Sequence, residues 1–167
     1  MQQLQRERAK NDLRFLFTDI LCYDKLDDFH LEIISTLKKI EESQDRKGLF
    51  LLPRGHWKST LITIAWTIQK LLNEPDSAIL IANATLSNAQ MFLREIRGHF
   101  EKDNKLKELF GDFVSDKWTD SELIIRQRRV IKKEPSIRVG SPDHTTVGSH
   151  YDIIILDDIV SPENINT

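Results

Sequence analysis

The stretch Asp152-Ile153-Ile154-Ile155-Leu156-Asp157-Asp158 joins four consecutive apolar residues to an acidic pair. Such a run is typical of a strand buried on both faces of a parallel sheet. Ligands of parallel sheets bind at the carboxyl ends of the strands, where this acidic pair falls. Two adjacent carboxylates at the end of a buried strand repel each other, which favours a nearby cation. The alternative is that the acids cap a turn after a core strand.

Other apolar runs predict further strands, and helical periodicity fills the intervals between several of them. Strands are expected at 49–52, 78–82, 123–125, 130–131, 137–139 and 153–156. Apolar residues spaced by three and four predict helices over 13–21, 29–40, 59–72, 86–100 and 105–110. This alternation predicts an α/β fold with right-handed crossovers and a mainly parallel sheet.

Composition narrows the class of protein. The 167 residues fit one domain, and 24 basic against 26 acidic side chains give a net charge of −2. This balance excludes binding to nucleic acid through bulk positive charge, although a local basic patch remains open. A single cysteine, Cys22, excludes an internal disulfide framework, and no run reaches the length of a membrane span. The polar start, Met1 to Lys10, has no signal-peptide core, so we expect a cytosolic protein.

A short polar loop, Leu52-Pro53-Arg54-Gly55-His56-Trp57-Lys58-Ser59-Thr60, separates the first expected strand from the helix at 59–72. Set against the phosphate-binding pattern G-x-x-x-x-G-K-[ST], Lys58 and Ser59 match, while Leu52 and Trp57 occupy the glycine positions. Gly55 remains to give the backbone unusual dihedral angles. Loop amides and the helix dipole at such a place favour an anion.

The chemistry of phosphate binding assigns roles to these side chains. Lys58 would place its charge between the β- and γ-phosphates, the Ser59 hydroxyl would ligate Mg²⁺, and Thr60 offers a second hydroxyl. At the other strand end, Asp157 would hold the Mg²⁺ through its water shell, and Asp158 stands where an acid could orient water. The two motifs together point to ATP hydrolysis with Mg²⁺. The structural alternative keeps Lys58 as a surface lysine and Ser59 as an N-cap.

Beyond these motifs, the sequence resembles the N-terminal ATPase domain of the large terminase subunit, the DNA-packaging motor of tailed phages. The resemblance covers nearly everything from Phe29 to Asp158. It rests on the loop 51–60, on the segment 79–85 with Ala89 and Gln90, on Leu109-Phe110-Gly111-Asp112-Phe113 followed by Trp118, and on Val147-Gly148-Ser149-His150-Tyr151-Asp152 before the acidic strand.

The resemblance implies a three-layer, additional-strand, RecA-like P-loop NTPase, incomplete at its C-terminus. We expect an N-terminal helical segment at 1–28 and a truncated ATPase domain at 29–167, with no nuclease domain. The expected catalytic residues are Asp158, Arg54 and Lys58, and the expected metal ligands are Ser59 and Asp157. The expected nucleotide-binding residues are Pro53, Arg54, Gly55, His56, Trp57, Lys58, Ser59, Thr60 and His30, with His30 reading adenine. Thr85 and Gln90 resemble parts of a conformational relay.

The family also implies partners and a cellular place. These are double-stranded DNA, a terminase small subunit, a portal protein and a homo-oligomeric ring in the host cytoplasm, with no membrane. Asp158 stands in place of the commoner glutamate, and the loop before the acidic strand lacks the usual arginine. A nucleotide-binding or assembly fragment without turnover and a helicase-like DNA-dependent ATPase therefore stay open. The basic cluster Arg126, Arg128, Arg129, Lys132 and Lys133 fits a solvated hairpin better than a phosphate contact.

Overall fold

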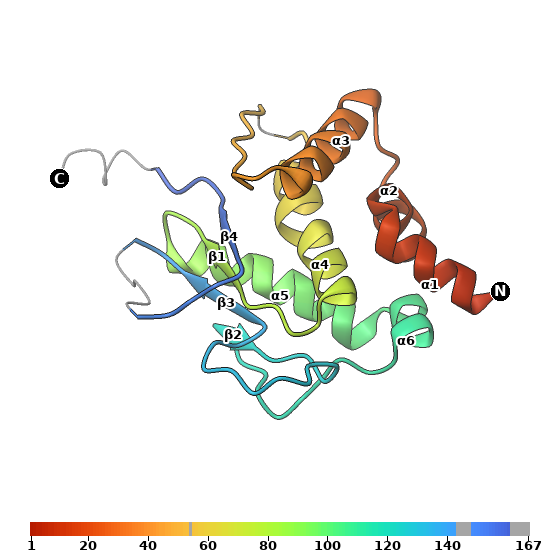
Figure 1. Ribbon diagram of the computed structural model, residues 1–167. Helices are drawn as coiled ribbons and strands as arrows, with labels where there is room; N and C mark the ends of the chain where they lie inside the picture. Colours follow the sequence, from red (N-terminus) through yellow and green to blue (C-terminus); the bar gives the residue numbers. More distant parts are fainter. Residues whose placement is uncertain (54, 143–147, 161–167) are drawn as a thin grey trace.

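The computed structural model describes residues 1–53, 55–142 and 148–160, which form a mixed α/β fold (Figure 1). The α-helices are α1 (Gln2–Asn11), α2 (Leu13–Phe15), α3 (Asp28–Glu42), α4 (Thr67–Asn73), α5 (Leu86–Lys102) and α6 (Asn104–Phe110). Two π-helical segments are η1 (Leu16–Ile20) and η2 (Ser59–Trp66). The strands are β1 (Ile79–Ala82), β2 (Glu122–Leu123), β3 (Ile137–Gly140) and β4 (Ile153–Leu156).

The four strands form one sheet in the order β2-β3-β1-β4. Both β3 and β4 run parallel to β1, and β2 runs antiparallel to β3. The register aligns Ala82 with Gly140 and with Leu156, so three strands end at one edge of the sheet. The predicted mainly parallel α/β sheet is therefore confirmed.

Helices cover one face of this sheet. Ile79, Ile81, Ile137, Val139 and Ile155 point to that face and are buried. The alternate row on the other face holds Leu80, which is half-buried, the Arg138–Glu122 ion pair and the exposed Ile154. The third layer expected from the resemblance, a set of helices on the second face, is absent from the part of the chain that the structure describes.

The predicted strand at 49–52 is wrong. Residues 49–52 contain no strand, and the side chains of Leu49 and Leu51 are 82% exposed. A strand needs a neighbour to bond its backbone groups, and the nearest candidate is β4. A hollow of about 1100 Å³, lined by Leu49 and Phe50 on one side and by β4 on the other, separates the two segments. Residues 49–52 therefore lie across this hollow from β4 and are not part of the sheet.

Two smaller strand predictions also need correction. The strand expected at 123–125 is shortened to β2, which holds only Glu122 and Leu123. Residues 130–131 form no strand, and Ile131 is fully exposed. The amides of Arg129 and Val130 donate to Asp76 Oδ1 at 2.7 and 2.9 Å, so a carboxylate takes the place of a strand partner here.

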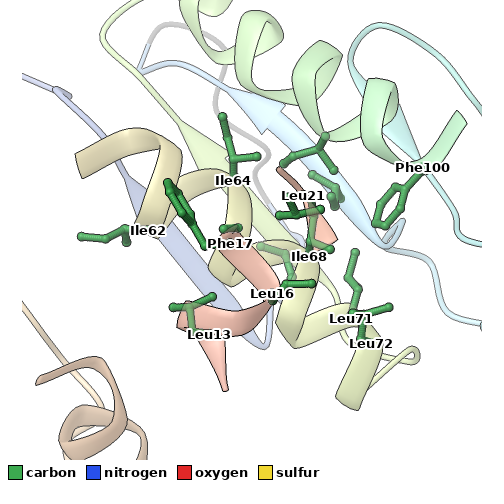
Figure 2. Close-up of a cluster of buried hydrophobic side chains, with 14 of the residues drawn as sticks. Leu13, Leu16, Phe17, Leu21, Ile62, Ile64, Ile68, Leu71, Leu72 and Phe100 are labelled. Carbon is green, nitrogen blue, oxygen red and sulfur yellow. The ribbon is translucent and has the colours of Figure 1, made fainter. Parts of the chain in front are cut away.

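One hydrophobic core unites the N-terminal segment with the rest of the chain. Figure 2 shows Leu16 and Phe17 packed among residues of η2 and α4, with Phe100 of α5 nearby. The expected helical segment at 1–28 is helical in α1, α2 and η1, and it contributes to this core. No helix within the described residues is long and apolar enough to cross a membrane.

Candidate phosphate and metal site

Lys58 lies between the two strand-end aspartates. Its Nζ is 3.1 Å from Oδ1 of Asp157 and 2.9 Å from Oδ1 of Asp158. Lys58 directly precedes η2, and the two acids directly follow β4, so a separation of 99 positions (157 − 58) is closed by the fold. The two motifs predict that Lys58 and Asp157 lie close together, and the structure brings both of them together with Asp158.

The three groups differ in exposure, and this difference sets their electrostatics. Asp157 is 4% exposed and Lys58 is largely covered, whereas the side chain of Asp158 is mostly in solvent. Burial by itself lowers the pKa of Lys58, but hydrogen bonds and charge attraction from Asp158 and Asp157 outweigh it, and the pKa is raised. Lys58 therefore stays protonated as the counter-charge of both acids.

The two carboxylate oxygens of Asp157 have different surroundings. Oδ2 accepts a hydrogen bond of 3.0 Å from the buried hydroxyl of Thr63, on the second turn of η2. Oδ1 is buried and accepts no hydrogen bond of regular geometry from any described group, although Lys58 Nζ is within ion-pair distance. A buried carboxylate oxygen without a donor is costly unless a cation compensates it. In this structure the ammonium group of Lys58 is that cation, and a carboxylate oxygen is also a ligand that Mg²⁺ accepts.

The loop before Lys58 takes two left-handed backbone conformations. Gly55 has φ +80°, and a Cβ built on it would meet nothing within 4 Å. Glycine is therefore favoured here by the backbone conformation and not by a lack of space. Trp57 has φ +53° although it carries a large side chain. This residue occupies the second glycine position of the phosphate-binding pattern. The loop keeps the positive φ that suits glycine even where glycine is replaced.

Aromatic contacts offset the strain at Trp57. Its ring lies edge-on to Phe17 and Tyr23, with centroids 6.3 and 6.2 Å away. Each such contact contributes about 0.5–1.5 kcal/mol, against about 1–2 kcal/mol for a left-handed residue. Tyr23 is fixed in turn, because its hydroxyl donates to Glu95 Oε1 at 2.6 Å. Burial and the Glu95 carboxylate raise the pKa of Tyr23, which keeps this hydroxyl protonated.

His30 contacts the backbone of the loop that precedes Lys58. It is 2% exposed, and its Nδ1 accepts from the amide of Asp27 at 3.0 Å as part of the capping box of α3. Since Nδ1 accepts, Nε2 carries the proton and donates to the carbonyl of His56 at 3.3 Å. Both ring nitrogens are thus engaged with backbone groups. A role of His30 in reading adenine, which the resemblance implies, would require one of these bonds to open.

The other residues predicted for the site differ in where they lie and in how exposed they are. Pro53, Gly55 and His56 are exposed in the loop, and Ser59 and Thr60 are half-buried at the start of η2. Arg54 lies outside the described residues, as does Val147. Thr85 is the N-cap of α5 and accepts from the amide of Asn88, while Gln90 lies half-buried on the same helix.

Four of the five side chains of the basic cluster have local partners. Arg126 pairs with Asp112, Lys132 pairs with Asp152, Lys133 donates to the carbonyl of Gly148, and Arg128 donates to the carbonyl of Glu134. These contacts favour the structural interpretation of the cluster over phosphate binding.

Two residues of the site escaped sequence reasoning: Thr63, described above, and Asn83. Asn83 directly follows β1, is buried, and donates from Nδ2 to the carbonyl of Asp157 at 2.7 Å. Thr63 interrupts the apolar stretch Leu61-Ile62-Thr63-Ile64, and a polar residue at such a position is the one signal that could have indicated a buried partner.

Comparison with known proteins adds nothing to the chemistry of the site. No protein-family model matches this chain, and no curated protein matches it in sequence.

Proposed function

We propose that the Lys58 site binds the triphosphate of ATP together with Mg²⁺ and hydrolyses the γ-phosphate. The observation that carries this proposal is the position of Lys58 Nζ, between the carboxylates of Asp157 and Asp158 at the start of a helix. An ammonium group and a hard-cation ligand so close together match the opposite charges of a triphosphate and its metal. The left-handed loop at Gly55 and Trp57 supports the same conclusion.

Each residue of the site would have its own role in binding the metal, the phosphates or the attacking water. Asp157 Oδ1 and the Ser59 hydroxyl would hold the metal, and Lys58 would turn from the carboxylates to the phosphate oxygens. Bound Mg²⁺ would supply positive charge against the β- and γ-phosphates. Asp158, freed from Lys58 and exposed to solvent, would orient the attacking water. Arg54, which is outside the described residues, remains a proposed partner of the γ-phosphate.

The wider role proposed here is the ATPase of a phage DNA-packaging motor, and it rests on the resemblance alone. Double-stranded DNA, a terminase small subunit, a portal protein and a ring of identical subunits in the host cytoplasm belong to that proposal. The finer fold assignment, an additional-strand P-loop NTPase, belongs to it as well.

A second candidate is a nucleotide-binding or assembly module without turnover. The observation that favours it is the open edge of β4, which pairs only with β1 among the described strands. Beside this edge lies the hollow described above, and Ile154 and Leu156 are 57% and 60% exposed. An apolar strand edge of this kind tends to acquire a partner, which is typical of an assembly component.

The experiment measures ATP binding by the change in tryptophan fluorescence and turnover by phosphate release, both with and without Mg²⁺. It compares the full chain with Lys58→Ala and with Lys70→Ala. Lys70 is a matched control, because it lies on the same continuous helix and pairs with Glu41 at 3.0 Å, not with the strand-end acids. We expect saturable binding and turnover that are lost in Lys58→Ala and kept in Lys70→Ala.

The outcomes separate the two candidates. Binding that depends on Lys58 without phosphate release would favour the second candidate over the first. Equal binding and turnover by the parent and by Lys58→Ala would refute both, as would no binding by the parent.

A further inference from the structure

One residue, Asn83, connects the carboxyl ends of three strands through its backbone and its side chain. Its backbone amide donates to the carbonyl of Gly140 at the end of β3, at 3.2 Å. Its Nδ2 donates to the carbonyl of Asp157 just after β4, at 2.7 Å, and both groups are buried. Its Oδ1 accepts from the amide of Thr85 at 3.3 Å and from Nδ2 of Asn88 at 3.2 Å, in the first turn of α5. Both the nitrogen and the oxygen of the Asn83 side-chain amide are therefore engaged.

The residue that follows this contact has an unusual backbone conformation. Asp158 has φ +45°, in the left-handed region that few residues other than glycine adopt, although aspartate tolerates it better than most. Hydrogen bonds hold the peptide groups on both sides of it. Asn83 holds the carbonyl of Asp157, and the amide of Ala84 donates to the carbonyl of Asp158 at 3.2 Å. A change of φ at Asp158 alone rotates these two carbonyls relative to each other and disturbs at least one of the two bonds.

Asn83 is not needed as the cap of α5. Thr85 already caps that helix, because its hydroxyl accepts from the amide of Asn88. The amide of Asp157 is also bonded independently, to the carbonyl of Ala82 at 2.9 Å. The side-chain bond of Asn83 that reaches the acidic pair is the one to the carbonyl of Asp157, and it orients the peptide between Asp157 and Asp158.

We infer that Asn83 is a positioning residue for the acidic pair. Its side-chain amide holds the Asp157–Asp158 peptide so that Asp158 stays left-handed and its carboxylate stays 2.9 Å from Lys58 Nζ. Without this donor, Asp158 relaxes to an extended conformation and its carboxylate leaves Lys58. The consequence for turnover rests on the proposed function, whereas the conformational consequence does not.

Three variants test this inference. Asn83→Asp is nearly isosteric and keeps an acceptor for Thr85 and Asn88, but its carboxylate cannot donate to Asp157. Asn83→Ala removes all side-chain bonds. The matched control is Asn88→Ala, which removes one hydrogen bond to Oδ1 of Asn83 and leaves the hydrogen bond from Asn83 Nδ2 to Asp157 in place.

The first readout is the backbone conformation of Asp158, measured by NMR from its amide–Hα coupling and its carbon shifts in the full chain. We expect left-handed values in the parent and in Asn88→Ala, and extended values in both Asn83 variants. Left-handed values in the Asn83 variants would overturn the inference. Should these variants fail to fold, the parent alone decides, because a buried donor to Asp157 requires an Asn83 side-chain amide proton that exchanges slowly. Fast exchange of that proton would overturn the inference too.

The second readout is turnover of ATP with Mg²⁺. We expect Asn83→Asp to lower kcat by about tenfold or more with a small change in KM, since a misplaced acid affects the reaction more than binding. Asn88→Ala should stay within about twofold of the parent. If the parent shows no turnover that depends on Lys58, the proposed function fails, and the NMR result still decides the role of Asn83. Unchanged kcat in Asn83→Asp beside an active parent would refute the positioning role alone.

Discussion

Replacement of Lys58 by methionine removes the counter-charge of two carboxylates while keeping most of the side-chain volume. Loss of one partner from a buried ion pair costs about 3–5 kcal/mol, because the other charge stays buried and unpaired. Here Lys58 is 23% exposed, so water replaces part of the lost contact, and the exposed Asp158 adds no more than about 1 kcal/mol. We expect Lys58→Met to lower the free energy of unfolding by about 2–3 kcal/mol.

Urea denaturation of four proteins measures this effect: the parent, Lys58→Met, Asp157→Asn and the double variant. With a urea slope of about 1–3 kcal/mol per molar, the single Lys58 change should lower the urea midpoint by about 0.7–3 M. In the Asp157→Asn background the same change should cost less than about 1 kcal/mol, because no buried charge is left unpaired. Additivity of the two changes within about 0.5 kcal/mol would refute the reasoning.

The pH dependence of this difference has a definite sign. The pKa of Lys58 is raised above its usual value of 10.5 in the folded chain. A raised pKa gives stability that is complete below the unfolded value and is lost as pH rises through the folded one. The difference between parent and Lys58→Met should therefore be constant from about pH 7 to 9 and shrink above about pH 10.5.

Three further changes probe other parts of the structure. Trp57→Gly removes the left-handed strain but also two aromatic contacts, so the free energy of unfolding should change by no more than about 2 kcal/mol. Fluorescence quenching should show that Tyr23 becomes more accessible. The amide of Ala78 and then Lys132 lower the pKa of Asp152 despite some burial, so its contribution is present at neutral pH and lost as pH falls through the folded value. Asp152→Asn should cost about 1 kcal/mol at pH 7, discounted for its half-exposed side chain, and less at pH 4 in urea titrations. Leu156→Lys should change the free energy of unfolding by no more than about 0.5 kcal/mol and reduce self-association measured by sedimentation, because this residue is 60% exposed on an open edge.

The sequence predicted those parts of the fold that depend on local pattern. The apolar run of β4 and the helical spacing of α5 led to the correct elements, and the motif at Lys58 led to the correct neighbour of Asp157. The strand expected at 49–52 had the same apolar pattern as β4, but a pattern does not reveal whether a neighbouring strand is in place to bond it. Strand formation at such a run is decided by tertiary pairing.

The remainder of the site depends on geometry that residue types do not encode. The π-helical segment η2, which carries Thr63, and the positive φ of Trp57 have no signal in the residue types, and Trp57 packs against Phe17 of the N-terminal segment. Asn83 could have been a solvated loop residue on sequence grounds. Its buried amide becomes meaningful only once β1 and β4 are known to be neighbours.

The pairing of β4 with β1 also affects the order in which parts of the chain fold. The strand that completes this pair is made some 70 residues later than its partner, in a chain of 167. Contacts between such distant segments form slowly, because the long intervening loop must first be closed. On the ribosome, Lys58 is made 99 residues before Asp157, so the ion pair between them forms only after β4 has been made.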